Sequence, residues 1–223
     1  MTSTSSPTRL GRRQILILLG VVGLLAGLPA GYGVGKLIKL AKQAGPVGWS
    51  AELSLGIATL LIIGGVAILL ATITNASAAY LADPHDEGPI RKLRPGQLTY
   101  FRLQGGVLTL AGLMMAAPEL IHILAPSLSG SLAGASYLAL VATFALQTVL
   151  NIQLYRRSDE LIRRTTADAG SACFWLLQAL LFLWAAGEKL ALLPHLNSWD
   201  AFTVLMSVYL FMSAAVAYRR GFR

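Results

Sequence analysis

The sequence predicts an all-α integral membrane protein, a bundle of six transmembrane helices in three hairpins with both termini cytoplasmic. Of the 223 residues, 55% are hydrophobic and only 13% are charged, whereas soluble domains carry roughly 25% charged residues. The mean hydropathy is +0.64, and long apolar runs recur along the chain. These three observations exclude a soluble enzyme, a disordered chain and a disulfide scaffold.

Six apolar runs define the expected helices. Residues 1–13 are expected to form a polar cytoplasmic tail, and residues 14–223 a single membrane domain. Each run holds about 20 residues, which at roughly 1.5 Å per residue crosses a hydrocarbon core of about 30 Å. Short loops after the third and fifth runs predict antiparallel hairpins. The expected spans are 14–35, 51–73, 103–125, 131–154, 169–193 and 199–218.

Paired arginines precede the first span. Arg12 and Arg13 stand before an apolar stretch with small residues near its end, a pattern that resembles a twin-arginine export signal. Such signals carry folded soluble proteins, whereas everything downstream here is expected to lie in the membrane. We therefore interpret 14–35 as an ordinary first transmembrane helix.

Basic residues indicate how the bundle is oriented. Of the 18 Lys and Arg residues, 14 fall on the side that holds both termini, and only Lys36, Lys39, Lys42 and Lys189 fall on the other. The positive-inside rule places the basic side in the cytoplasm, which predicts a multi-pass protein of the bacterial inner membrane. The net charge of +8 then reflects orientation and contact with anionic lipids, so no nucleic-acid partner is expected.

A stripe of glycines on the first span is expected to pack against another helix. Glycines at every fourth position fall along one helix face and let a second backbone approach closely. The partner is a second copy of the chain, a different protein or another helix of the same chain. The stripe consists of Gly23, Gly27, Gly31 and Gly35.

A few ionisable residues lie in or beside the apolar runs, toward the side opposite the basic loops. One interpretation is that they mark the membrane–water interface, where such groups cost little. The other is a polar cluster that relays protons or ions, since histidine titrates near neutrality. The candidate residues are Glu52, Glu119, His122, Glu188 and Lys189, with His195 and Asp200 nearby.

Catalytic motifs are not recognisable in the sequence. Glu119 and His122 form one half of a Glu-x-x-His di-metal pattern, but the second half is missing. We therefore expect no catalytic residue, no metal and no cofactor, and a membrane-embedded metalloenzyme is a minor alternative. Amides within the apolar runs are expected to form interhelical hydrogen bonds; they are Gln104, Gln147, Asn151, Gln153 and Gln178.

A charged segment joins the fourth and fifth spans. Asp159 precedes Arg163 by four residues, and Glu160 precedes Arg164 by four, a spacing that supports a helix. We expect the fourth helix to continue into the cytoplasm until Gly170 turns the chain. The segment is either a solvated helix or a docking surface for a partner.

This Asp-Glu-x-x-Arg-Arg segment, followed by an apolar helix and by Glu188, Pro194 and Trp199, resembles a loose group of uncharacterised bacterial two-helix hairpin membrane proteins. The resemblance covers residues 153–218 and implies a bacterial membrane location, with no activity to carry over.

The expected function is that of a non-catalytic accessory or assembly subunit of a membrane complex, or of a homo-oligomer packed through the first helix. The alternative is a small proton- or ion-coupled transporter that uses the Glu/His cluster.

Overall fold

The computed structural model describes residues 31–33, 35–36, 38–39, 42, 48–73, 95–125, 127 and 130–219. Regular structure in this part of the chain is entirely helical. Five helices are long and apolar enough to cross a membrane, which confirms an all-helical, multi-pass membrane class. They are α2 (Trp49–Ala71), α4 (Pro95–Leu124), α5 (Gly130–Arg157), α6 (Glu160–Lys189) and α7 (Ser198–Arg219). The expected first span falls mostly outside the described residues, so the count of six spans stays a prediction.

The centre of the fold is the contact between α2 and α4. Leu55, Ala58 and Leu61 of α2 pack against Met115 and Ala116 of α4 and are nearly inaccessible to solvent. Side chains from α7, including Met206, cover this cluster. The hydrophobic core therefore lies where three helices meet.

Glycines allow α2 and α4 to approach at backbone distance. A Cβ atom on Gly65 would lie 2.7 Å from the carbonyl oxygen of Gly105, and one on Gly105 would lie 2.9 Å from that of Gly65. Gly112 faces the backbone of α2 in the same way. Small residues at such positions are a common basis of helix association in membranes, because they bring long stretches of backbone into van der Waals contact.

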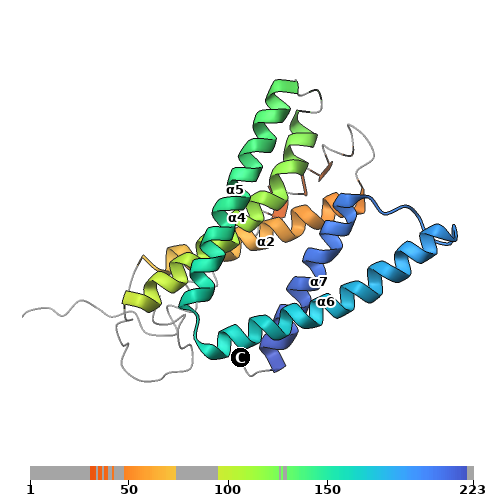
Figure 1. Cartoon of the computed structure of the whole chain (residues 1–223). Helices are drawn as coiled ribbons and strands as arrows, with labels where there is room; N and C mark the ends of the chain where they lie inside the picture. The colour runs from red at the N-terminus through yellow and green to blue at the C-terminus, as the bar shows by residue number, and fades with distance from the viewer. Residues whose placement is uncertain are drawn as a thin grey trace, which may run out of the picture.

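Two hairpins follow along the chain, and in Figure 1 their outer helices, α5 and α6, diverge from the junction that connects them. The α4–α5 hairpin has short connecting residues, and α5 packs mainly against α4. None of the 28 residues of α5 is buried. In the second hairpin, α6 packs on α7. The buried residues of α6 are Ala169, Cys173 and Leu177, which recur every fourth residue on one face.

The junction between α5 and α6 corrects one sequence prediction. The helix was expected to run on from the fourth span until Gly170, but α5 ends at Arg157 and α6 begins at Glu160. Asp159 has extended backbone and accepts a hydrogen bond from the Ile162 N–H at 2.8 Å. It is thus an N-cap, and such caps begin a new helix rather than continue an old one. The charged segment belongs to α6, which passes through Gly170 without interruption.

The end of α6 also differs from the predicted span, which extended to residue 193. The N–H groups of Leu192 and Leu193 both donate to the Gly187 carbonyl, and Ala191 has a positive φ of 56°. These contacts close the helix at Lys189. A Cβ atom on Gly187 would lie 2.7 Å from Leu193 Cδ1, so a larger residue there would require the Leu193 side chain to move.

A reciprocal cap starts α7. The Asp200 N–H donates to the Asn197 side chain at 2.8 Å, and the Asn197 N–H donates to the Asp200 carboxylate at 3.3 Å. This arrangement satisfies donors that the first turn of a helix leaves open. Asp200, a candidate polar residue, is therefore buried and engaged in capping.

Candidate functional site

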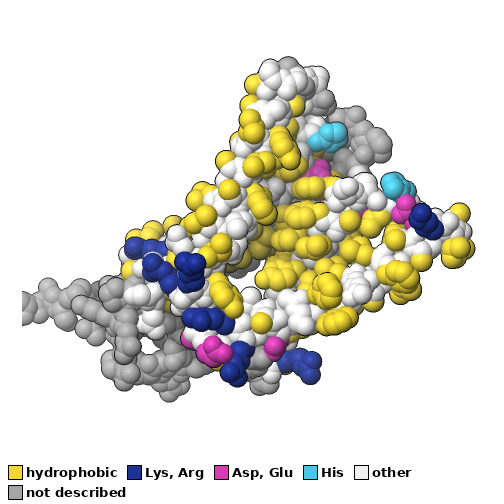
Figure 2. All heavy atoms as spheres, viewed as in Figure 1, with side chains coloured by type: hydrophobic (Ala, Val, Ile, Leu, Met, Phe, Trp, Pro, Cys, Tyr) yellow, Lys and Arg dark blue, Asp and Glu magenta, His cyan; other side chains and the backbone are white. Residues whose placement is uncertain are grey.

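Charged side chains divide between the two ends of the helices. Most of the visible Lys and Arg side chains in Figure 2 lie where α4 begins and α5 ends, toward the lower left of the view, whereas the histidines lie at the upper right. We call the first region the basic end; it contains Arg102, Arg156, Arg157, Arg163, Arg164 and Arg219. The opposite end, here called the polar end, contains the candidate cluster.

Glu52 forms a separate pair at the polar end. Its carboxylate lies 2.5 Å from Lys42 Nζ, with both side chains partly exposed. Exposed ion pairs contribute about 0–1 kcal/mol to stability. This contact links the start of α2 to Lys42. The neighbouring Trp49 and Leu53 line a small apolar pocket together with Trp184 and Leu196 of the α6–α7 turn region.

Glu188 pairs with His195 across the α6–α7 turn. His195 Nδ1 lies 2.5 Å from Glu188 Oε1, and the Leu196 N–H donates to Oε2 at 3.3 Å. The hydrogen bond to Glu188 and its negative charge raise the pKa of His195 above its ordinary value. Trp184 Nε1 donates to the Pro194 carbonyl at 3.2 Å. The pair therefore belongs to a well-bonded turn, and neighbouring Lys189 extends beside it.

Glu119 forms the third group of the polar end. Its carboxylate lies near the Trp199 indole N–H, but the two do not form a well-aligned hydrogen bond. His122 and Asp200 are within electrostatic range of the same carboxylate. Thr203, one turn beyond Trp199, is fully buried, and no described residue hydrogen-bonds to its hydroxyl. Glu119 thus lies beside the first turn of α7, which holds Trp199 and the buried Asp200.

The candidate cluster consequently resolves into three local groups: Glu52 with Lys42, Glu188 with His195, and Glu119 with His122 and Trp199. Within the described ranges, no set of three His, Cys, Asp or Glu side chains has a geometry that could hold a metal ion. Asp200 lies within electrostatic range of both Glu119 and His195, so the second and third groups are neighbours at the polar end.

The docking segment is engaged mostly in its own helix junction. Glu160 Oε1 accepts from Arg164 Nε at 2.8 Å, as predicted by their spacing. Arg163 turns back instead, and its Nε donates to the Ser158 carbonyl at 3.0 Å. Its guanidinium also lies 5.9 Å from the centre of the Tyr155 ring, within cation–π range. Asp159 and Arg163 therefore hold the α5–α6 junction in place.

The glycine stripe is only partly within the described residues. Gly23 and Gly27 lie outside them. At Gly31 and Gly35, an added Cβ atom would meet no described atom within 4 Å. Among the described residues, nothing packs closely on these two positions, in contrast to Gly65, Gly105 and Gly112. Those three glycines form the tight contact of the fold and were not predicted from the sequence to do so.

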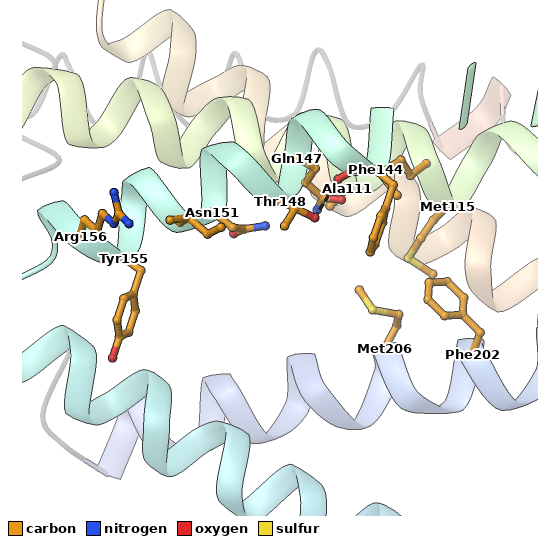
Figure 3. A pocket seen from close by; sticks show the side chains of 12 residues that line it. Ala111, Met115, Phe144, Gln147, Thr148, Asn151, Tyr155, Arg156, Phe202 and Met206 are labelled. Atoms are coloured by element: carbon orange, nitrogen blue, oxygen red, sulfur yellow. Dashed lines mark hydrogen bonds between the residues drawn. The ribbon is translucent and has the colours of Figure 1, made fainter. Parts of the chain in front are cut away.

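A groove between α4, α5 and α7 was not predicted from the sequence. Its volume is about 680 Å³, within the range of roughly 300–1,000 Å³ that is common for ligand sites. Figure 3 shows Phe144 and Asn151 of α5 reaching toward the space that Met115, Phe202 and Met206 border. Asn151, Tyr155 and Arg156 lie toward the basic end. The available sequence signal was the spacing of Gln147, Asn151 and Tyr155, which places them on one helix face.

A second amide marks the exposed face of α6. Gln178 lies in the middle of the apolar part of α6, on the side opposite the α7 contact, and its side chain is exposed. No described residue hydrogen-bonds to it. Phe174, Trp175 and Phe182 flank it on the same face and are 61%, 65% and 70% exposed.

Comparison of the chain with protein-family models, with curated proteins and with solved structures finds no significant match.

Proposed function

We propose that this chain is a non-catalytic multi-pass protein of the bacterial inner membrane that acts as an accessory or assembly subunit of a membrane complex, or as a homo-oligomer. The observation that carries this proposal is Gln178. An amide at the middle of a membrane-spanning helix is costly when it faces lipid, because hydrocarbon offers no hydrogen-bond partner.

A second helix that supplies a donor or acceptor would satisfy Gln178. Interhelical hydrogen bonds of this kind contribute about 0.6–1.7 kcal/mol, which is roughly a threefold to twentyfold change in association. The flanking Phe174, Trp175 and Phe182 provide a broad apolar surface for the same contact. Gly31 and Gly35, where an added Cβ atom would meet no described atom within 4 Å, support a further contact through the first helix.

The orientation is proposed from the basic end. The positive-inside rule assigns the side with more arginines to the cytoplasm. The arginines of the basic end and of the terminal segments are therefore proposed to lie on the cytoplasmic side. The exposed face of α6 then meets its partner within the bilayer, and Arg157 and Arg164 lie beside anionic headgroups.

The test is association of the full chain in mild detergent. Two differently tagged copies are co-expressed in the native host, and co-purification of the second tag and of other membrane proteins is measured for wild type and for Gln178→Leu. We expect the variant to lose association by roughly threefold to twentyfold. Gln153→Leu is the matched control, since it removes an exposed amide near the basic end of α5. Equal association of wild type and both variants would contradict the proposal.

The transporter is the second candidate, and Glu119 is the observation that favours it. A carboxylate beside Trp199 and Asp200 can take up and release protons within the membrane domain. Reconstituted protein should then show proton or solute flux that Glu119→Gln abolishes and Glu52→Gln preserves. Absence of a flux sensitive to Glu119 would remove this candidate.

A further inference from the structure

We propose that the groove between α4, α5 and α7 binds one anionic phospholipid, with its phosphate at Arg156 and one acyl chain along the apolar wall. This site goes beyond the proposed subunit function and depends only on the membrane-spanning class of the protein.

The inner part of the groove is suited to a hydrocarbon chain. Phe144, Phe202, Met115 and Met206 line it, together with Ala111. Methionine side chains are flexible and adapt to an irregular apolar surface. An acyl chain makes only van der Waals contacts, which this lining provides.

Polar groups follow in the order that a phospholipid requires. Along α5, Asn151 lies about 7.5 Å from Arg156 at 1.5 Å per residue, on the apolar side of it. A phospholipid presents its phosphate outermost, then its ester oxygens, then its chains. The Asn151 amide is thus at the level of the esters and can donate to them when Arg156 meets the phosphate.

Charge selects an anionic headgroup. Arg164 is paired with Glu160, and Arg163 donates to backbone carbonyls. Among the described acids, none pairs with Arg156, whose side chain is exposed at the mouth of the groove. A guanidinium binds phosphate through two parallel hydrogen bonds, which makes Arg156 the anchor of the site.

The experiment measures lipid retention by native mass spectrometry. Full-length protein is delipidated in detergent and then mixed with dioleoyl phosphatidylglycerol or with dioleoyl phosphatidylcholine. We expect one phosphatidylglycerol to be retained per chain and phosphatidylcholine to be retained much less. Arg156→Gln should lower phosphatidylglycerol retention by about tenfold, the loss expected for a charge-assisted contact.

Two further variants separate the groove from general surface charge. Arg157→Gln makes the same charge change at the neighbouring position, which does not line the groove, and its loss should be much smaller. Thr148→Phe fills the groove at an exposed position of α5 and leaves the charge unchanged, so it should also lower retention. Circular dichroism and the detergent elution profile check that each variant is folded.

Three results would overturn the proposal. Equal losses for the Arg156 and Arg157 variants would mean that retention reflects surface charge alone. Unchanged retention in Thr148→Phe would mean that no chain occupies the groove. A dimer without lipid, whose contact is lost in Thr148→Phe, would mean that a second copy fills the groove instead.

Discussion

A Cβ atom placed on Gly112 of α4 would lie 2.6 Å from the carbonyl oxygen of Ala58 in α2. The two helices therefore meet at a distance that only a hydrogen side chain permits. Substitution Gly112→Ala should force the helices apart and destabilise the protein by about 1–3 kcal/mol, as is usual for overpacked sites. Thermal unfolding in detergent measures the change.

The matched control for this prediction is Gly106→Ala, on the same helix. An added Cβ atom there meets no atom within 4 Å, and alanine favours a helix over glycine by about 0.5–1 kcal/mol. Gly106→Ala should therefore be neutral or slightly stabilising. A loss of stability equal to that of Gly112→Ala would contradict the close crossing.

The Glu188–His195 pair predicts a pH dependence of the α6–α7 turn. Because the pKa of His195 is raised by Glu188, the charged histidine stabilises the folded turn. This contribution is complete below the unfolded pKa of about 6.5 and is lost as the pH rises through the folded pKa. Hydrogen exchange at the Leu196 amide, which donates to Glu188, should accelerate over that interval.

The cause of this dependence can be tested separately by NMR titration of His195. Glu188→Gln should lower the pKa of His195 toward its ordinary value, because it removes both the charge and the ionic hydrogen bond. Lys189→Gln changes the charge of the neighbouring residue and should not lower that pKa. A His195 pKa that is insensitive to Glu188→Gln would contradict the pairing.

Asp159 predicts a local effect at the start of α6. Asp159→Ala should destabilise the first turn by about 0.5–2 kcal/mol, because the Ile162 N–H loses its acceptor. Asp159→Asn retains an acceptor and should cost much less. Amide hydrogen exchange at Ile162 is the measurement, and equal protection in both variants would show that a cap is not needed there.

Orientation in the membrane can be tested with single cysteines. In a Cys173→Ser background, Leu192→Cys lies in the α6–α7 turn, and Thr166→Cys lies near the basic end; both positions are exposed. The positive-inside rule predicts that a membrane-impermeant thiol reagent labels only the Leu192 variant in intact cells. Labelling of the Thr166 variant alone would reverse the proposed orientation.

The membrane class was predictable from the sequence, because the length and hydropathy of each apolar segment determine by themselves whether it can cross a bilayer. Each of the five described helices overlaps an expected span, and the boundaries differ where hydrogen bonds decide them. The prediction that the fourth helix continues through residues 158–168 was wrong. Charge pairs at i, i+4 favour any helix and do not reveal where a helix begins. The cap at Asp159 became visible only with its backbone conformation and its bond to Ile162.

The groove and the close crossing of α2 and α4 could not be predicted from the length and hydropathy of single segments. Both depend on which helices become neighbours. Gly105 and Gly112 are separated from Gly65 by the connection between the helices, so no spacing within one helix links them. The positions of the candidate carboxylates in the spans say nothing about their partners, because Lys42, His195 and Trp199 come to them through turn geometry and packing.

The α2–α4 crossing also has a consequence for recognising related proteins. Apolar helices from unrelated membrane proteins match one another by composition, since leucine, valine and alanine exchange freely on surfaces that face lipid. Gly65, Gly105 and Gly112 cannot exchange in this way, because each would press a methyl group against a neighbouring backbone. A glycine at each of these three positions, across two helices, is therefore a more selective signature of common descent than the hydrophobic pattern of the whole chain.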